Sequence, residues 1–308
     1  MPIRIAVIGY GKIARDQHVP SIAADPRFEL AALVSPRAPA DEGVPVFTSH
    51  EALLEAMAGK LDAVAICTPP TVRLAVAEAA FEAKVDVLLE KPPAATLGEI
   101  EQIERLGRDS GQTLFTAWHS QHAAGVAAAR AALAGKTVSS VRIHWHEDVR
   151  KWHPGQEWIW GPGGFGVFDP GINALSIATR ILPERLFVRE ATLSFPENKQ
   201  TPIAARITFE GEKGRFAADL DWRRTEGERW TIRVETEDGG TVELLDGGAR
   251  MIVDGEPRAV EDRGEYPSLY ARFAELVEAR ESDVDREPLR IVADAFLIGR
   301  REIVEPFA

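Results

Sequence analysis

The first third of the chain alternates short apolar runs with segments of helical spacing. The apolar runs predict buried strands, at residues 3–11, 30–35, 61–70, 85–93 and 113–120. The amphipathic segments between them predict helices, at residues 51–59, 71–83 and 97–111. In the last of these, Leu97, Ile100 and Ile103 recur on one helical face. This alternation, with continuously apolar strands, is typical of a doubly wound parallel sheet covered on both faces.

After about residue 120 the pattern changes to alternating apolar and polar positions broken by turn residues. A helical segment at 125–135 leads into such runs, at residues 138–149, 189–195, 202–210, 214–223, 229–240 and 241–260. They predict a mainly antiparallel sheet of about five or more strands with one face open to solvent. Two helical patterns close the chain, at residues 268–280 and 288–305. We therefore predict an α/β domain over 1–120 and an α+β domain over 121–308.

Composition narrows the class of partner. The 308 residues are 45% hydrophobic and 27% charged, with a net charge of −12. Nucleic-acid binding depends on clustered basic residues, and no basic block is present. Cys67 is the only cysteine, which fits a reducing compartment. Apolar runs fall short of the ~18 residues of a membrane span. We predict a cytoplasmic protein whose partner is a small molecule, with no nucleic-acid or membrane partner.

The stretch "VIGYGKIA" carries a glycine pattern between the first strand and its following helix. Gly9, Gly11 and Ala14 form G-x-G-x-x-A in the strand–turn–helix context that dinucleotide binding needs. Gly9 permits a tight turn, Gly11 lets a pyrophosphate approach the backbone, and Ala14 allows close helix packing. The helix N-terminus offers N–H groups to the phosphates. The alternative is a glycine turn that is only structural.

The end of the second strand bears on the choice of cofactor. NAD-selective sites place an acid there to bind the ribose 2′-hydroxyl. This chain has Ser35 and then Arg37. A hydroxyl and a guanidinium suit a 2′-phosphate. We predict NADP, with NAD also usable; the alternative is that Arg37 is a solvated loop residue.

The run "VLLEKPPA" ends an apolar strand on Glu90 and Lys91. A parallel strand would deliver Lys91 to its carboxyl end, where ligands usually bind. Pro92 and Pro93 restrict the backbone, so Lys91 leaves the sheet in a defined direction. Local sequence does not distinguish this reading from an ordinary surface lysine.

A second group of polar residues lies in "GVFDPGINALS". Asp169 could cap a helix with Pro170 at its first position. Asn173 follows four residues later, so both polar side chains would share one side of the first turn. Several glycines precede them and predict a closely packed loop, at Gly161, Gly163, Gly164 and Gly166.

A third group gathers histidines, acids and indoles along residues 146–160, with "AWHS" adding two more. Its members are His146, Glu147, Asp148, Trp152, His153, Trp158, Trp160, Trp118 and His119. The spacing fits no zinc template, so we predict no metal site. Polar groups among indoles suit a sugar, whose hydroxyls need hydrogen bonds and whose C–H faces stack on aromatic rings. The alternative is that the indoles only fill the contact between domains.

Together these segments resemble the glucose–fructose oxidoreductase / inositol dehydrogenase / rhizopine catabolism (Gfo/Idh/MocA) family over essentially the whole chain. The resemblance rests on "GKIARDQH" at 11–18, "LEKPPAATLGE" at 89–99, "WHPGQEWIW" at 152–160 and "GVFDPGINALSI" at 166–177. It implies an N-terminal Rossmann domain whose strand tip carries E-K-P. It also implies a C-terminal domain with a large open-faced sheet, for substrate binding and oligomerisation. A dimer or tetramer is expected from the resemblance alone.

The resemblance also implies roles for individual residues. The catalytic residues would be Lys91, Asp169 and Asn173. The substrate-binding residues would be Lys91, His119, Glu147, Trp152, His153, Asp169 and Asn173. The cofactor-binding residues would be Gly9, Tyr10, Gly11, Lys12, Ile13, Ser35, Arg37, Cys67, Thr68, Pro69, Glu90 and Lys91. Where the family usually has D-x-G-x-H-x-x-D, this chain has Asn173 and Ser176 in place of the histidine and second acid. The base would then be Asp169 or Lys91.

The implied activity is that of an NAD(P)-dependent aldose 1-dehydrogenase. It would oxidise C1 of a pyranose, such as L-arabinose, D-galactose or D-fucose, to the aldonolactone by hydride transfer to nicotinamide. Two alternatives stay open: a dehydrogenase of another sugar or polyol such as D-xylose or inositol, and a non-catalytic relative that senses sugar or nucleotide.

Overall fold

The computed structural model describes residues 1–36, 43–211 and 215–307, which form two compact units. Unit 1 comprises Met1–His119 and Gly264–Arg286, and unit 2 comprises Ser120–Arg263 and Glu287–Ala308. The predicted division at residue 120 is close to the first boundary. It misses the return of 264–286 to unit 1, because that segment is separated in sequence from the sheet on which it packs.

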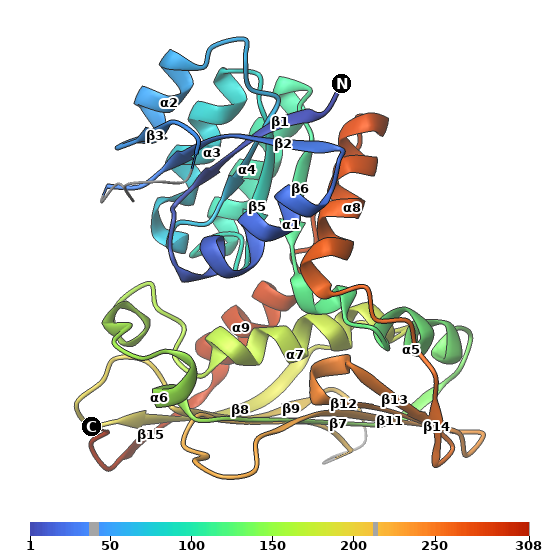
Figure 1. Ribbon diagram of the computed structural model, residues 1–308. Helices are drawn as coiled ribbons and strands as arrows, with labels where there is room; N and C mark the ends of the chain where they lie inside the picture. Colours follow the sequence, from blue (N-terminus) through green and yellow to red (C-terminus); the bar gives the residue numbers. More distant parts are fainter. Residues whose placement is uncertain (37–42, 212–214, 308) are drawn as a thin grey trace. The chain divides into compact units, whose positions relative to one another are not determined.

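Unit 1 is built on a six-stranded parallel sheet with the order β3-β2-β1-β4-β5-β6 (Figure 1). Its strands are β1 (Ile3–Ile8), β2 (Phe28–Val34), β3 (Val46–Phe47), β4 (Ala63–Ile66), β5 (Asp86–Glu90) and β6 (Leu114–Ala117). The central strands β4, β5 and β6 are buried at every residue. Chain order reverses between β1 and β4, the position where such sheets bind ligands. The predicted doubly wound sheet is confirmed.

Helices cover this sheet, and their ends follow local sequence signals. They are η1 (Ala14–His18), α1 (Val19–Ala24), α2 (His50–Ala56), η2 (Pro70–Val72), α3 (Arg73–Glu82), α4 (Leu97–Ser110) and α8 (Glu265–Ala279). In α4 the Thr96 hydroxyl accepts from Glu99 N–H, and the Glu99 carboxylate accepts from Thr96 N–H. Gly111 ends the helix in the left-handed region at φ 74°.

Helix α8 belongs to unit 1 because it buries aromatic side chains in the core of this sheet. Tyr270 and Phe273 are fully buried in one cluster with residues of β1, β2, β4 and β6. The Phe273 ring stacks on Phe28 and Phe115 at 6.2 Å between ring centroids. Burial of such large apolar side chains is the main stabilising term that holds a distant segment to a sheet.

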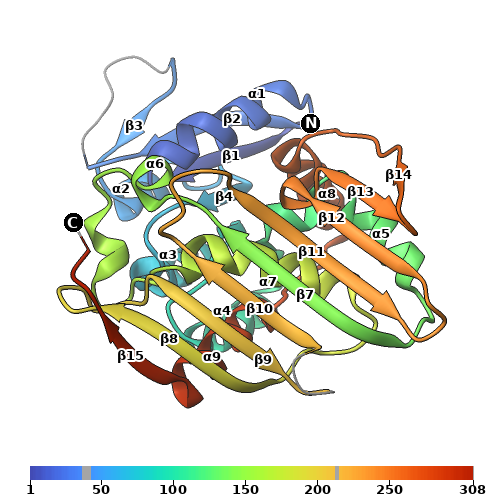
Figure 2. The same cartoon turned by 90° about the horizontal axis from the view of Figure 1, so that it is seen from below.

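Unit 2 is built on a nine-stranded sheet with the order β14-β13-β12-β11-β7-β10-β9-β8-β15 (Figure 2). Its strands are β7 (Val138–His146), β8 (Val188–Pro196), β9 (Ala204–Phe209), β10 (Phe216–Asp221), β11 (Arg229–Thr236), β12 (Thr241–Leu245), β13 (Arg250–Val253), β14 (Glu256–Arg258) and β15 (Arg300–Val304). Most neighbours are antiparallel, as predicted. Two pairs are parallel, β10 with β7 and β15 with β8.

One face of this sheet is covered by helices (Figure 1). The helical elements of unit 2 are α5 (Val126–Leu133), α6 (Val149–Trp152), η4 (Glu157–Trp160), α7 (Phe168–Ile181), η5 (Asp246–Gly248) and α9 (Glu287–Ile298), and η3 (His119–His122) lies at its start. Helix α7 packs so closely that a Cβ on Gly171 would lie 2.6 Å from Leu220 Cδ1 of β10. In the described ranges no helix covers the opposite face, which Figure 2 shows from the front. The predicted open-faced sheet is confirmed.

The C-terminal helix is shorter than predicted. The pattern over 288–305 predicts one helix, but α9 ends at Ile298 and the chain continues as β15. A Cβ on Gly299 would lie 2.3 Å from Ala295 O, so glycine suits this sharp exit. The residues that follow alternate between exposed and half-buried positions. Parallel pairing with β8 therefore replaces the last helical turns.

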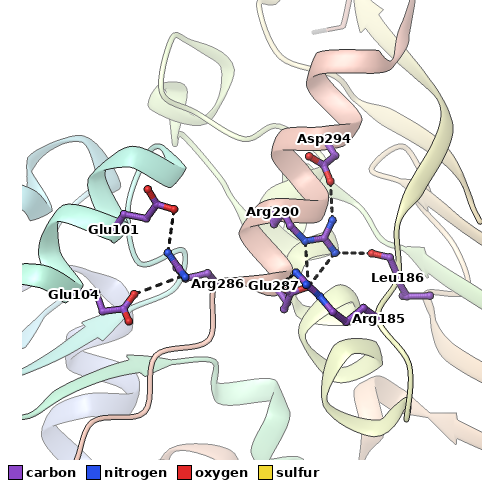
Figure 3. A network of polar contacts seen from close by, with 8 residues as sticks. All are labelled: Glu101, Glu104, Arg185, Leu186, Arg286, Glu287, Arg290 and Asp294. Carbon is purple, nitrogen blue, oxygen red and sulfur yellow. Dashed lines mark hydrogen bonds and ion pairs between the residues drawn. The ribbon is translucent and has the colours of Figure 1, made fainter.

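Two groups of ion pairs flank the chain between α8 and α9 (Figure 3). In unit 1, Arg286 lies 3.0 Å from Glu101 and 3.6 Å from Glu104 of α4. In unit 2, the Glu287 carboxylate accepts hydrogen bonds from the guanidinium groups of Arg185 and Arg290. Arg290 also donates to Leu186 O at 2.5 Å and to Asp294 at 2.7 Å. Each unit thus holds its own end of this segment.

Among the helices that the structure describes, none combines the length and the apolar character needed to cross a membrane.

Candidate active site

In unit 1, the predicted cofactor-binding residues follow the carboxyl ends of the parallel strands. The sites are residues 9–13 after β1, Ser35 after β2, residues 67–69 after β4, and Glu90 and Lys91 at the end of β5. Because the strands are parallel, these ends share one edge of the sheet. Arg37, which we predicted to bind a 2′-phosphate, lies outside the described residues.

The glycine loop has the geometry that a pyrophosphate requires. Gly9 has φ +96°, and a Cβ there would lie 2.7 Å from Thr68 N and 2.9 Å from Cys67 C. A side chain at this position would force the tips of β1 and β4 apart. At Gly11 a Cβ would have no neighbour within 4 Å, so the backbone is accessible from that side. Ala14 is fully buried, as expected for close helix packing. These residues fit a bound dinucleotide.

The remaining cofactor candidates of the first two strands differ in exposure. Ser35 is 7% exposed and donates its N–H to Phe47 O at 2.9 Å. Lys12 is exposed and forms an ion pair with Asp16 one turn along the helix. Ile13 is also exposed. The Arg15 guanidinium carbon lies over the Tyr10 ring, 5.9 Å from the ring centroid. Ser35 is therefore buried at the end of β2, whereas the side chains of Lys12 and Ile13 are exposed.

Lys91 is half-buried and directly follows the fully buried strand β5. The Lys91–Pro92 peptide bond is cis, and both prolines are buried. The lysine is therefore followed by a buried segment.

Arg73 holds the backbone that follows β4 and the backbone at the end of β5. Its side chain is buried and donates to Thr68 O from Nε at 2.9 Å and from Nη2 at 2.6 Å. Nη1 donates to Glu90 O and to Pro92 O. A single guanidinium thus ties the loop after β4 to the segment that carries Lys91. Arg73 is not predicted from the sequence, where it is only one charged residue in an amphipathic helix.

Glu90 lies in a buried polar network behind the lysine. Its carboxylate is 3% exposed, accepts from the Tyr266 hydroxyl at 2.5 Å and lies 3.3 Å from His18 Nε2. His18 Nδ1 makes a 2.8 Å hydrogen bond with the Tyr270 hydroxyl. Two of the four residues come from α8, which the sequence did not connect to this site. His18 ends the segment "GKIARDQH", but no local signal gives its partners.

Burial and ion pairing shift the pKa values of His18 and Glu90 in opposite directions. Burial disfavours the charged form of His18, but the Cys67 sulfur and the Glu90 carboxylate outweigh it and raise the pKa of His18 to about 10. Burial likewise disfavours the Glu90 anion, but His18 outweighs it and lowers the pKa of Glu90 to about 2. Burial and the Glu90 charge raise the pKa of Tyr266 well above its usual value, so it remains a donor. The network holds a buried ion pair at neutral pH.

His119 follows β6 and also rests on α8. Its Nδ1 lies 2.5 Å from Glu265 Oε2, and its ring stacks on Tyr266 at 5.2 Å between centroids. The predicted residues Glu90 and His119 are therefore both joined to Tyr266.

In unit 2, the predicted pair Asp169 and Asn173 lies on α7. The helix begins at Phe168, so Asp169 is inside its first turn and is not the N-cap that one reading allowed. Asp169 is 4% exposed, and Asn173 lies four residues on along the same side. His153 Nε2 lies 3.5 Å from Asp169 Oδ2, which adds a third predicted residue to this pair.

The loop that leads into α7 is closely packed at two of its four glycines. A Cβ on Gly164 would lie 2.4 Å from Ile159 O, and one on Gly166 would lie 2.3 Å from Pro202 O. Only glycine fits at these positions, and the close approach fixes where α7 starts. Gly161 is looser, with its nearest neighbour at 3.8 Å.

Glu147 directly follows β7 and is clamped by two indoles. Its Oε1 accepts from Trp222 Nε1 at 3.1 Å, and its Oε2 accepts from Trp230 Nε1 at 3.0 Å. The Trp222 ring in turn contacts the rings of His153 and Trp160, at 5.1 and 5.3 Å between centroids. Glu147 therefore positions an aromatic wall beside the Asp169 group.

Trp152 is the exposed member of this wall. Its side chain is 42% exposed, its Nε1 donates to Glu228 at 2.7 Å, and its ring lies 5.5 Å from that of Trp230. Trp222, Trp230 and Glu228 were not singled out from the sequence, because β10 and β11 bring them in from positions far along the chain.

The predicted residues thus fall into two groups. Unit 1 brings together the glycine loop, the strand tips, Lys91 and His119. Unit 2 brings together Glu147, Trp152, His153, Asp169 and Asn173. Each group is completed by residues that local sequence did not reveal.

Comparisons with known proteins place this arrangement in a family. A family model described as an oxidoreductase family with an NAD-binding Rossmann fold (Gfo/Idh/MocA) matches residues 3–118. The chain is 46% identical over 308 residues to galactose 1-dehydrogenase from Pseudomonas fluorescens, covering 99% of both chains. The crystal structure of a D-galactose-1-dehydrogenase protein from Rhizobium etli matches with a TM-score of 0.93 and 50% identity, covering 100% of this chain and 98% of that one. A 3-ketoreductase from Actinomadura kijaniata, solved with NADP, shares the fold at a TM-score of 0.84 and 18% identity.

The chain belongs to the Gfo/Idh/MocA family of oxidoreductases. It is an enzyme that uses NAD or NADP, as the glycine loop predicts.

Proposed function

We propose that this enzyme is an aldose 1-dehydrogenase that oxidises C1 of a pyranose to the aldonolactone. The main support is its similarity, over nearly the full length of both chains, to galactose 1-dehydrogenase. D-Galactose is the first proposed substrate. L-Arabinose and D-fucose are proposed as well, because they share its configuration at C2 to C4 and differ at C5.

The reaction needs a hydride acceptor and a base. The nicotinamide, when bound, supplies the acceptor. The anomeric hydroxyl must lose its proton as the hydride leaves, so a base has to lie within hydrogen-bond reach. Asp169 is our first candidate for that base, and the nearby His153 imidazole is suited to orient its carboxylate. Lys91 as an ammonium would stabilise the developing negative charge on O1; as a free amine it could replace Asp169 as the base.

The other polar residues would hold the sugar ring. Asn173 and His119 offer hydrogen bonds, and the exposed indole of Trp152 offers a stacking surface. Both oxygens of Glu147 already accept from indoles. We therefore propose that Glu147 contributes by orienting Trp222 and Trp230. Tight orientation supplies a large part of the rate in such reactions.

The proposed order of cofactor use is NADP with NAD also accepted, resting on Ser35 and Arg37. Comparing kcat/KM for the two cofactors before and after Arg37→Ala tests this directly. A fall in the NADP to NAD ratio of about tenfold is expected from loss of one charged contact. An unchanged ratio would contradict the role of Arg37.

The activity itself is tested with purified protein, each cofactor, and a panel of aldoses and inositols, following absorbance of the reduced nicotinamide. Turnover of D-galactose with lactone as product supports the proposal. A clear preference for D-xylose or an inositol would contradict it and favour the second class of substrate. No turnover of any sugar, with cofactor binding intact, would favour a relative that senses sugar or nucleotide.

The assigned residues are tested by Lys91→Ala and Asp169→Asn. Each should lower kcat by about 10²–10⁴ while the affinity for the cofactor stays within a few-fold. Exposed residues of the same type provide controls, Lys84→Ala and Asp246→Asn, and these should keep normal turnover. Near-normal kcat in either test variant would remove that residue from the mechanism.

A homo-oligomer and a cytoplasmic location remain part of the proposal. The first rests on the family resemblance and the second on the single cysteine.

A further inference from the structure

A compact set of metal-ligating side chains lies on the uncovered face of the sheet in unit 2. His144 and His146 are two residues apart on β7, so their side chains point to the same face. They alternate with the buried Ile143 and Trp145, which face the helices. Asp219 of β10 alternates in the same way with Ala218 and Leu220. All three therefore lie on the face opposite α7.

Strand register brings these side chains together. β10 runs parallel to β7, with Asp219 opposite His144 and Asp221 opposite His146. Asp219 Oδ2 lies 3.3 Å from His146 Nε2 and 4.0 Å from His144 Nδ1. One donor atom from each residue lies within 4.8 Å of the other two. Donor atoms about 2.0–2.2 Å from a tetrahedral ion are about 3.3–3.6 Å apart, so small side-chain rotations would complete the set.

The two histidine nitrogens make no hydrogen bond of normal geometry, and His146 Nε2 has the 3.3 Å ion-pair contact with Asp219. His144 Nδ1 and His146 Nε2 are buried, and neither has a hydrogen-bond partner in the part of the chain that the structure describes. Buried polar atoms without such a partner are rare in folded proteins and call for an explanation. Here both point toward the same carboxylate. The side chain of Asp219 is 46% exposed in the single chain, so the third ligand lies at the surface of the sheet.

We propose that His144, His146 and Asp219 form a binding site for a divalent transition-metal cation, with Zn²⁺ as the best match. Two imidazoles and one carboxylate are ligands that Zn²⁺ uses, and solvent can fill the fourth position. Imidazole nitrogen also suits Co²⁺, Ni²⁺ and Cu²⁺, whereas Mg²⁺ and Ca²⁺ need oxygen ligands. No residue of this set was given a role in the proposed sugar oxidation, so the inference is independent of it.

Positively charged neighbours limit the affinity expected of this site. Arg229 lies opposite His146 and Arg206 opposite Asp219 in the sheet register. Their positive charge opposes the cation, so we expect micromolar rather than tighter affinity.

The test uses the full chain after treatment with a chelator and removal of the chelator. Titration with ZnCl₂ in a calorimeter should show saturable binding of about one ion per chain. Co²⁺ should produce visible absorption bands typical of a site with nitrogen ligands. His146→Gln and Asp219→Asn should each weaken Zn²⁺ binding by about tenfold or more.

Matched controls separate this site from general metal binding. Asp221→Asn changes the next acid on the same face of β10, and it should leave Zn²⁺ affinity unchanged because Asp221 is already bound by Arg223. His50→Gln, in unit 1, should also have no effect. Circular dichroism establishes that each variant is folded. If Asp219→Asn fails to fold, His144→Cys serves instead. It should retain binding and add a near-ultraviolet thiolate-to-Co²⁺ band. No saturable Zn²⁺ binding by the unmodified chain, or equal binding by folded Asp219→Asn, would overturn the proposal.

Discussion

Two buried glutamates illustrate how the two units position their candidate catalytic residues by different means. Glu90 is the last residue of β5 and Glu147 directly follows β7. They are 3% and 4% exposed. Glu90 is paired with an ionisable histidine and a tyrosine hydroxyl. Glu147 accepts hydrogen bonds from two neutral indole N–H groups, those of Trp222 and Trp230.

This difference predicts that substitution of Glu90 and of Glu147 will affect stability to different extents. The carboxylate of Glu90 and the imidazolium of His18 compensate each other, so removing one charge leaves the other buried without compensation. Glu147 accepts from two indole N–H dipoles, which carry no net charge, so each of these contacts can be lost without leaving a buried ion behind. The stability of the segment beside Lys91 should therefore depend on the ionisation of His18 and Glu90. The stability of the aromatic wall near Asp169 should depend on hydrogen-bond geometry.

The largest effect should follow Glu90→Gln. The amide is nearly the same size as the carboxylate but leaves the His18 charge unpaired, so we expect a loss of about 3–5 kcal/mol in the free energy of unfolding. Urea denaturation near pH 6 measures it. A loss below about 1 kcal/mol would mean that His18 and Glu90 do not form a buried ion pair.

Glu147→Gln provides the direct contrast and should have a smaller effect. Glutamine keeps one carbonyl acceptor, so one of the two indole N–H groups loses its partner at a cost of about 1–3 kcal/mol. The same denaturation experiment measures this loss, and tryptophan fluorescence reports the change around Trp222 and Trp230. A loss as large as that of Glu90→Gln would remove the distinction between the two sites.

The pH dependence of stability should separate the sites further. The pKa of His18 rises from 6.5 to about 10 on folding, so its contribution is complete below about pH 6.5 and is lost as the pH rises to about 10. The pKa of Glu90 falls from 4.5 to about 2, so its contribution is complete above about pH 4.5 and is lost in stronger acid. Both contributions are complete only between about pH 4.5 and 6.5.

The variant His18→Gln tests this window. The stability difference between the unmodified chain and this variant should be greatest near about pH 5.5. It should shrink by about 1 kcal/mol or more by about pH 9.5. Glu147→Gln should show no such trend over the same range. A constant difference for His18→Gln would rule out a pKa of His18 near 10.

The parts that sequence predicts correctly are those set by neighbours along the chain. Gly9 and Lys91 each sit in a local pattern, a glycine turn after a strand and a lysine between a strand and two prolines. The structure places both at the predicted strand ends. Their chemical roles remain predictions. Arg37 cannot be placed at all, because it lies outside the described residues.

The parts that sequence misses depend on distant contacts. Arg73 and Tyr266 are ordinary residues of amphipathic helices until folding brings them to the backbone and side chain of Glu90. The spacing of His144 and His146 was a local signal, since two histidines separated by one residue share a face of a strand. Their third partner, Asp219, could be identified only once β10 was known to lie beside β7. Residues 299–305 were misjudged because pairing with β8 overrides a helical pattern.

The smallest effect should follow Trp152→Phe, at the exposed end of the wall that Glu147 supports. Phenylalanine keeps an aromatic face but removes the N–H that donates to Glu228 at 2.7 Å. Because the ring is 42% exposed, stability should fall by less than about 1 kcal/mol. If this face stacks on the sugar, KM should rise about two- to fivefold with kcat nearly unchanged, since the lost orientation affects binding in the ground and transition states alike. Steady-state kinetics with D-galactose measures both. Phe187→Leu, a similarly exposed aromatic residue elsewhere in unit 2, serves as the control. A fall in kcat at constant KM would instead place Trp152 among the groups that act on the reacting carbon, and would make the aromatic wall part of the catalytic machinery.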